Sequence, residues 1–282
     1  MKECVLELKN ISYSYDKEAE VLKNINIKIH KGERIGVIGN NGAGKSTFFL
    51  LLNGILFPDT GSIALYGEDI KNSRRDILSL RKEVGYVFQD PDNQIIAPTV
   101  ESELSFGLIN IKTPKEGIKE KLNCTIHQLG LEKYRTTPPH YLSGGEKKRV
   151  SIGDIVVMEP NVLLFDEPTS SLDHKNIQVF ETILEEQLKH GTTALISTHD
   201  YDFIWKWADR ILVFHEGELV GDDTAEEIFT NQYLLDTFSL KKPAMLKMVE
   251  MIAEIRGRQL PKRLPKNEEM LHEYMKEILQ DR

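Results

Sequence analysis

Residues 34–47, RIGVIGNNGAGKST, decide the fold of this chain. The apolar run 34–39 predicts a fully buried strand, and a helical pattern follows from Ser46 to Leu56. Between them the chain fits G-x-x-x-x-G-K-[ST], a loop whose backbone N–H groups cradle phosphates. A glycine-rich turn that merely contains Lys-Ser is the alternative, but the strand and helix on either side are the context that the motif requires. We therefore predict a nucleoside-triphosphate site.

The residue types in this loop have separate expected roles. Three glycines allow the backbone to turn, and the start of the helix adds its positive end. Lys45 brings a full charge to the β- and γ-phosphates, and Ser46 can coordinate Mg²⁺. The predicted nucleotide-binding residues of the loop are Gly39, Asn40, Asn41, Gly42, Ala43, Gly44, Lys45, Ser46 and Thr47.

A second buried-strand pattern, VLLFDE at residues 162–167, ends in two adjacent acids. Phosphoryl transfer leaves a protein mainly positioning and charge neutralisation to perform, so a metal-binding acid and a base suffice. We predict Asp166 in the Mg²⁺ shell and Glu167 as the base for the attacking water. The two acids could instead cap the chain that follows, but the phosphate loop elsewhere in the sequence favours the site.

The stretch LSGGEKKRV, residues 142–150, begins another helix with a serine and two glycines. Such a helix start exposes backbone N–H groups and suits an anion. It could also be a plain N-cap with Glu146 in a capping box. Because the triphosphate already has its own loop, this second anion site predicts contact with a nucleotide held by another copy. That arrangement requires a head-to-tail two-fold dimer with two composite sites.

The remaining patterns predict an α/β protein. Alternation over residues 4–30 indicates two antiparallel strands with a turn near residues 16–20. Buried-strand patterns recur at residues 84–88, 162–167, 193–198 and 210–220, separated by helical patterns, which favours a mostly parallel core sheet. Helices dominate about residues 90–158. We predict a domain over residues 1–230 and a helical extension over residues 231–282.

Two apolar stripes mark that extension. One comprises Met245, Met248, Met251 or Ile252, and Ile255; the other comprises Met270, Leu271, Tyr274, Met275, Ile278 and Leu279. Docking onto their own domain and contact with a second subunit both account for such stripes.

Composition narrows the class of protein. The 282 residues carry a formal net charge of −8, which argues against a nucleic-acid partner. No apolar run reaches the roughly 18 residues needed to span a bilayer, and the first ten residues have no signal-peptide pattern. Cys4 and Cys124 are lone thiols, and the histidines show no metal-ligand spacing. We expect a cytoplasmic protein whose membrane role, if any, needs a partner.

The motifs together resemble the ATP-binding-cassette ATPases. GNNGAGKST, LSGGE, VLLFDE, SSLD (170–173) and STHD (197–200) follow one another in that family's order over about residues 5–225. The resemblance implies ATP and Mg²⁺ as ligands of a P-loop NTPase cassette. It implies that Tyr15 stacks on adenine and that Gln89 contacts Mg²⁺ and the attacking water. It further implies γ-phosphate contacts by His199 and, across the dimer, by Ser143, Gly144 and Gly145, with Asp173 linking the two sites.

Longer stretches, among them YVFQDPDNQI and STHDYDFIWKWADRILVFHEGELV, look like the ATPase subunit of energy-coupling-factor importers, and the cobalt-transport ATPase in particular. This likeness implies a peripheral protein on the cytoplasmic face of the cell membrane. Its partners would be a second, identical or different ATPase, an integral membrane coupling subunit and a substrate-binding membrane subunit. The cargo would be cobalt or nickel, with a vitamin as the alternative. A soluble cassette ATPase is a further alternative, which the absence of a long coiled coil disfavours.

Two features of this chain concern its partner and its helix packing. In the family, the face that begins at residues 89–95, QDPDNQI, docks a coupling helix of the membrane subunit. We therefore predict partner coupling by Asp90, Asp92 and Gln94, with the two acids meeting basic residues.

Gly153 and Asp154 stand where the family commonly has Ala and Gly, and an acid there must find a partner or face solvent. GLIN after Phe106 also departs from the family's usual Gly-Pro.

Overall fold

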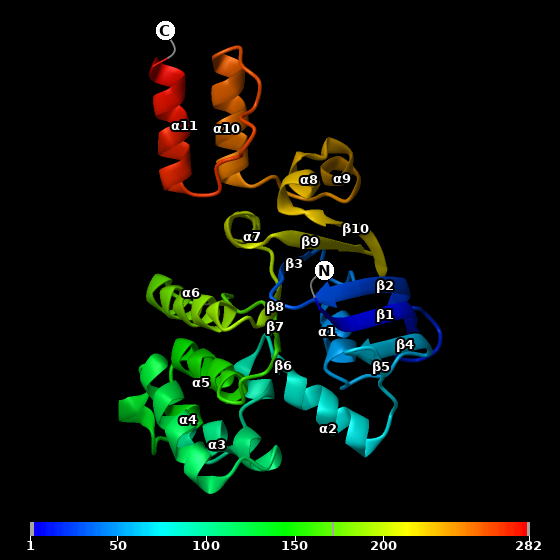
Figure 1. The fold of residues 1–282 in the computed structure, drawn as a ribbon, viewed down its shortest axis with the longest axis vertical. Coiled ribbons are helices and arrows are strands. Elements are labelled where there is room, and N and C mark those ends of the chain that lie inside the picture. Colours follow the sequence, from blue (N-terminus) through cyan, green and yellow to red (C-terminus); the bar gives the residue numbers. More distant parts are fainter. Residues whose placement is uncertain (1–2, 171, 281–282) are drawn as a thin grey trace.

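The computed structural model describes residues 3–170 and 172–280, and its strands form two sheets (Figure 1). The first sheet is antiparallel, with the order β2-β1-β4-β5. It comprises β1 (Cys4–Tyr13), β2 (Leu22–His30), β4 (Thr60–Leu65) and β5 (Glu68–Asp69). The predicted pair over residues 4–30 is confirmed, whereas β4 and β5 were not anticipated.

The second sheet has the order β10-β9-β3-β8-β7-β6. All neighbouring strands run parallel except β9 and β10, which confirms the mostly parallel core. Its strands are β3 (Arg34–Ile38), β6 (Val84–Val87), β7 (Val162–Asp166), β8 (Thr193–Ser197), β9 (Arg210–His215) and β10 (Glu218–Thr224). Residues 210–220 therefore form parts of a hairpin and not the single strand expected. Glu216 and Gly217 have φ of 46° and 82°, as a two-residue hairpin turn requires.

Alternate residues of the core strands pack against opposite layers. In β7, Val162 and Leu164 join the cluster that contains the antiparallel sheet and α1 (Lys45–Leu52). Leu163 and Phe165 join the cluster that contains the helices on the other side. Since side chains alternate along a strand, a strand buried on both faces must be apolar throughout. This explains the continuous apolar runs in the sequence.

Three helices form the expected helical insertion: α3 (Val100–Asn110), α4 (Lys115–Gln128) and α5 (Gly144–Val156). They lie at the end of the molecule opposite the C-terminus (Figure 1). Short 3-10 turns flank them: η1 (Pro91–Asn93), η2 (Glu132–Tyr134) and η3 (Pro139–Tyr141). The other helices of the core are α2 (Arg74–Glu83), α6 (His174–Lys189) and α7 (Tyr201–Trp207).

Helix α1 ends at Leu52, earlier than the predicted Leu56. The chain leaves the helix because Gly54 adopts φ of 67°, a conformation that glycine takes at little cost.

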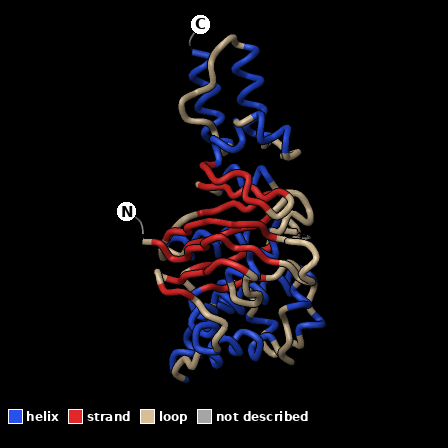
Figure 2. Tube along the Cα trace, turned by 90° about the vertical axis from the view of Figure 1, so that its right-hand side faces the viewer, coloured by secondary structure: helices blue, strands red, loops and turns tan. Residues whose placement is uncertain are grey.

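Helix α8 (Ala225–Thr230) ends the predicted domain. The C-terminal extension contains α9 (Gln232–Thr237), α10 (Ala244–Ile255) and α11 (Glu268–Gln280). The last two helices project side by side from the body, beyond β9 and β10 (Figures 1 and 2). Leu235 and Leu240 belong to the same buried cluster as the core sheet. The domain boundary at residue 230 therefore stays a prediction.

Of the stripe predicted on residues 244–255, Met245 and Ile252 are half-buried against the core cluster, and the other members face solvent, so both interpretations stay predictions. The buried side chains of α10 are Leu246, Val249 and Ala253, whereas Met248, Met251 and Ile255 are 45%, 58% and 78% exposed. On α11, Tyr274 and Ile278 are buried, Met270 and Leu271 are half-buried, and Met275 and Leu279 are exposed. Each helix thus packs on its own molecule with one face and keeps apolar side chains in contact with solvent.

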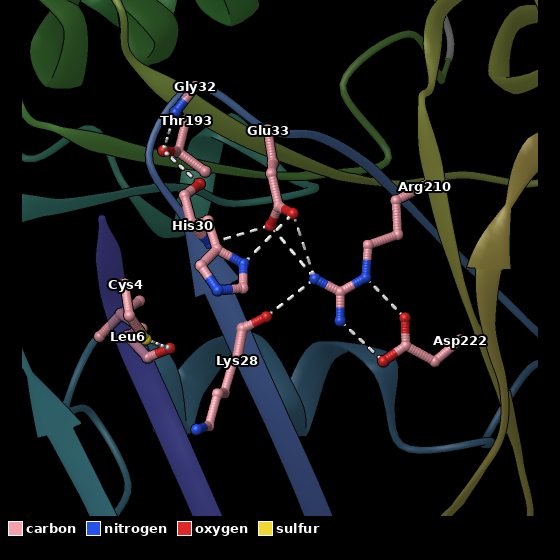
Figure 3. A network of polar contacts seen from close by, with 9 residues as sticks. All are labelled: Cys4, Leu6, Lys28, His30, Gly32, Glu33, Thr193, Arg210 and Asp222. Carbon is pink, nitrogen blue, oxygen red and sulfur yellow. Dashed lines mark hydrogen bonds and ion pairs between the residues drawn. The ribbon is translucent and has the colours of Figure 1, made fainter. Parts of the chain in front are cut away.

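A polar network joins the two sheets at the amino end of β3 (Figure 3). Arg210 forms an ion pair with Asp222 through two hydrogen bonds, of 2.6 and 2.7 Å, and a second ion pair with Glu33 at 3.1 Å. It also donates to the carbonyl oxygen of Lys28 in β2 at 2.8 Å. The planar guanidinium can serve three acceptors at once, so one side chain ties β2, β9 and β10 together. The phosphate loop emerges from the opposite end of β3.

Candidate functional site

The loop between β3 and α1 is shaped by close backbone contacts. A Cβ at Gly39, whose φ is 147°, would lie 2.1 Å from the carbonyl oxygen of Phe214. At Gly44, with φ of 102°, it would lie 2.7 Å from the side chain of Leu22. Any other residue at these two positions would displace the loop. The glycines thus hold the backbone N–H groups of the loop in one place at the start of α1.

Lys45 is the buried cation of this loop. Its side chain is 8% exposed, and Nζ donates to the carbonyl oxygens of Gly39 at 2.7 Å and Asn40 at 3.0 Å. Burial lowers the pKa of Lys45, while the charges of Glu167 and Asp166 act in the opposite direction. The ammonium of Lys45 offsets part of the negative charge of the two carboxylates and can donate to an anionic ligand.

The two predicted acids lie at the carboxyl end of β7. Asp166 is 4% exposed and its Oδ2 accepts from the Tyr86 hydroxyl at 3.1 Å. Glu167 has φ of 45°, a left-handed conformation unusual for a residue with a side chain, and its N–H donates to the carbonyl oxygen of Ser197 at 2.8 Å. Burial is the main effect that raises the pKa of the Glu167 carboxyl. A raised pKa makes this carboxylate a better proton acceptor.

His199 follows β8 and faces both the loop and the second acid. Its Nε2 lies 2.8 Å from Oδ1 of Asn41 and 3.7 Å from Oε1 of Glu167. Burial, and next the charge of Lys45, lower the pKa of His199. The neutral ring that this favours can donate one hydrogen bond and accept another.

These groups share one cavity of about 400 Å³. Of the predicted residues, the cavity is lined by Asn41, Gly42, Ala43, Gly44, Lys45, Ser46, Thr47, Gln89, Asp166, Glu167 and His199. Gly39 and Asn40 form the loop's first turn but do not line it. Val21, Ser170 and Ser197 line it without having been predicted, although the two serines begin the quoted motifs SSLD and STHD.

The cavity has the chemistry of a magnesium-nucleotide site. Among the residues that the structure describes, Oε1 of Glu167 and Oγ of Ser197 are buried and have no hydrogen-bond partner. Buried polar atoms normally have one, so these two are available for a ligand or water. Ser46, Gln89 and Asp166 offer the oxygen donors that Mg²⁺ prefers, and Lys45 and the loop N–H groups suit phosphates.

Tyr15 lies at the edge of this site. Its ring is 59% exposed and meets the ring of Tyr13 edge-on, with 5.1 Å between centroids. Its hydroxyl is 3.1 Å from that of Thr47 in α1. An exposed aromatic face beside the phosphate loop is compatible with stacking on a base, which stays a prediction.

The serine-glycine start of α5 lies outside the cavity. Ser143 caps α5 in a capping box, in which its N–H donates to Glu146 at 2.8 Å, so the plain-cap interpretation also holds. Ser143 and Gly144 are exposed, and Gly145 is half-buried, where a Cβ would lie 2.4 Å from the side-chain nitrogen of Asn176. Asp173 caps α6 and accepts from that same Asn176. The chain thus keeps the serine-glycine start of α5 close to Asp173, and neither lines the cavity of its own phosphate loop.

The segment after β6 is held by α5. Asp90 accepts from the N–H of Asp92 at 3.0 Å, and Asp92 forms an ion pair with Lys147 at 2.7 Å. Gln94 turns inward: Nε2 donates to the carbonyl oxygen of Ser151 at 2.7 Å and to Asp154 at 3.2 Å. Of the three predicted coupling residues, only Asp90 and Asp92 are exposed, and Asp92 already has a basic partner within the chain.

Asp154, the acid that departs from the family pattern, has Gln94 as its partner. Burial raises its pKa to about 7, and the hydrogen bond from Gln94 opposes this only in part. The folded protein therefore holds a proton on Asp154 between roughly pH 4 and pH 7 that the unfolded chain releases. The contribution of Asp154 to stability must fall as pH rises through that interval.

We expect Asp154→Asn to remove this pH dependence, because the amide stays uncharged and can still accept from Gln94. The variant should be more stable than the natural protein at about pH 8, by on the order of 1–3 kcal/mol, and nearly equal to it at about pH 4. Thermal melts at the two pH values measure this. Asp69→Asn, on exposed β5, controls for the loss of one charge. If the variant and the natural protein differed in stability by the same amount at both pH values, Asp154 would not have a raised pKa in the folded protein.

Comparisons with known proteins agree with this geometry. The profile of the family described as ABC transporter matches residues 22–170. The chain is 40% identical over 264 residues to the energy-coupling factor transporter ATP-binding protein EcfA2 of Methanospirillum hungatei, covering 94% of this chain but only 66% of that protein. It is 41% identical over 239 residues to EcfA of Methanothermobacter thermautotrophicus, covering 85% and 77% of the two chains.

A solved structure gives the same result for the fold. CbiO1 from Clostridium perfringens, part of the ABC transporter complex CbiONQ, superposes with a TM-score of 0.74 at 36% identity, over 90% of this chain and all of that one. Within the part of this chain that the structure describes, no helix is long and apolar enough to cross a bilayer. The chain belongs to the ABC transporter family of ATPases, among the ATP-binding proteins of energy-coupling factor transporters.

Proposed function

We propose that this chain hydrolyses ATP as one of two paired ATPase subunits of an energy-coupling-factor importer. The proposal rests on one observation. Lys45, Asp166, Glu167, Gln89 and His199 meet in one cavity, whereas the serine-glycine start of α5 lies outside that cavity. The chain thus has a hydrolytic centre and a separate anion-binding surface, which is complementary to the centre of a second subunit.

Each residue of the centre has one task in hydrolysis. Lys45 and the loop N–H groups hold and neutralise the β- and γ-phosphates of the substrate. Gln89 orients the attacking water, and Oε1 of Glu167 accepts its proton. His199 donates to a γ-phosphate oxygen. A magnesium ion, when bound to Ser46, Gln89 and Asp166, would supply further charge neutralisation.

Two surfaces support pairing. Ser143, Gly144 and Gly145 would contact the γ-phosphate held by the partner, and the neighbouring Asp173 would link the two sites. The apolar side chains that α10 leaves exposed, Met248, Met251 and Ile255, suit a second contact between subunits. A homodimer and a heterodimer with a related ATPase both use these surfaces.

A groove beside Gln94 supports docking of a membrane subunit. It is a cavity of about 230 Å³ between α5 and the core, lined by Ile55, Phe88, Gln94, Ile155 and Met158 among others. Its apolar walls suit a short helix of an integral membrane coupling subunit, and the exposed Asp90 and Asp92 lie on the same segment. This docking would hold the chain at the cytoplasmic face of the membrane.

We propose a cobalt or nickel ion as the cargo, bound by a further membrane subunit.

The test is purification of the tagged chain from detergent-solubilised membranes of its own cells, with mass spectrometry of the proteins and metal analysis of the complex. We expect two ATPase copies with at least one integral membrane protein, and stoichiometric cobalt or nickel. Met158→Glu in the groove should lose the membrane protein, whereas Met275→Glu on the exposed face of α11 should keep it. An ATPase that never co-purifies with a membrane protein contradicts the proposal, and a bound vitamin corrects the cargo.

A further inference from the structure

Lys148 is a buried cation on α5 whose partners lie in another element. The residue is 2% exposed, and its Nζ donates to the carbonyl oxygen of Phe88 at 2.8 Å and to that of Gln89 at 2.9 Å. An ammonium has three donors and no acceptor, so it can hold both carbonyls simultaneously. Neither carbonyl is part of a helix or sheet ladder, because both follow the end of β6.

Burial lowers the pKa of Lys148 to about 8, although nearby acids act in the opposite direction. The charges that act on Lys148 are those of Asp166, Asp90 and Glu167, all of them negative. A buried ammonium is costly unless its donors are satisfied, and here the two carbonyl oxygens accept from it. The side chain thus bridges α5 and the segment after β6.

Further contacts between α5 and the segment after β6 lie on either side of Lys148. Lys147 pairs with Asp92, Lys148 holds Phe88 and Gln89, and Gln94 reaches back to Ser151 and Asp154. Residues 88–94 are therefore fastened to α5 over about two of its turns. The strand before them belongs to the core sheet. A rotation of α5 relative to that sheet would carry Gln89 with it.

We propose that Lys148 is a positioning residue that fixes Gln89 to the helix whose first turn is Ser143–Gly145. This inference rests on the proposed function, in which that first turn meets the nucleotide of the partner. Docking of α5 on the partner's nucleotide then sets the place of Gln89 in this chain's own site. Nucleotide binding at one site thus changes the position of the catalytic glutamine in the other site through one turn of α5.

The first test separates turnover from binding. Lys148→Met keeps an unbranched side chain but removes the donor, so it should lower kcat by about 10²-fold, as small misplacements of reacting groups do, and leave KM for ATP within about threefold. Lys148→Arg, which can donate to both carbonyls, should recover most of kcat. Lys119→Met, which removes an exposed lysine from α4, should stay within about twofold of the natural protein.

The second test asks whether Lys148 acts through Gln89. Gln89→Ala should lower kcat by itself, and adding Lys148→Met should then lower it little further, because groups that act as a unit are not additive. Full additivity, or a kcat for Lys148→Met within about twofold of normal, would overturn the inference. If Lys148→Met melts early, Lys148→Gln, which keeps a neutral donor, takes its place in the same cycle. An inactive natural protein would instead count against the proposed function.

Discussion

Glu167→Gln is expected to lower ATP turnover by about 10³-fold or more while ATP binding persists. The amide has nearly the same shape as the carboxylate but cannot take a proton from water. Oε1 of Glu167 is buried, lacks a hydrogen-bond partner among the described residues and faces the cavity with Lys45 and Asp166. The loss should therefore fall on kcat, measured as phosphate release at saturating ATP.

The same variant gives a second readout. If the closed pair forms on ATP and opens on hydrolysis, Glu167→Gln should accumulate as a dimer when ATP and magnesium are added. Sedimentation velocity with and without ATP measures this. Glu181→Gln, which removes an acid from the outer part of α6 where it pairs with Lys206, should keep normal turnover. Normal hydrolysis by Glu167→Gln would exclude this residue as the base.

Short local motifs predict the location of the candidate site because the topology of the core sheet brings them together. Gln89, Glu167 and His199 each come directly after a core strand, and the phosphate loop follows β3. The strands β6, β7, β8 and β3 are neighbours and run parallel, so their carboxyl ends meet at one edge. Short motifs at strand ends are thus brought together without any long-range information in the motifs themselves.

Features that depend on tertiary packing were not predictable in this way. Residues 244–255 are apolar on two faces, so periodicity alone cannot tell that Leu246 and Val249 are buried and Met251 is not. Helix α2 buries only Leu80, which leaves almost no apolar signal in its sequence. Lys148 is one of three consecutive basic residues, and nothing local distinguishes the buried one from its neighbours.

Lys45→Ala should weaken ATP binding by about 10²-fold, because a charge-assisted hydrogen bond to phosphate in a partly desolvated site contributes on the order of 1.5–3 kcal/mol. Lys45 is the buried cation at the start of α1, and its charge faces Asp166 and Glu167. Without it, those two carboxylates would repel the triphosphate. Equilibrium titration with ATP and magnesium measures the loss.

A thermal melt distinguishes lost binding from a damaged loop. In the natural protein Nζ also donates to the carbonyl oxygens of Gly39 and Asn40, so alanine should lower the melting temperature somewhat even without ligand. A ligand that binds only the folded state raises the melting temperature by an amount that grows with the logarithm of its concentration relative to its dissociation constant. ATP should therefore stabilise the natural protein, Glu167→Gln and the exposed-lysine control Lys206→Ala, but not Lys45→Ala. Equal stabilisation of Lys45→Ala would contradict the assignment of the phosphate site, since no other buried cation of the described chain lines that cavity.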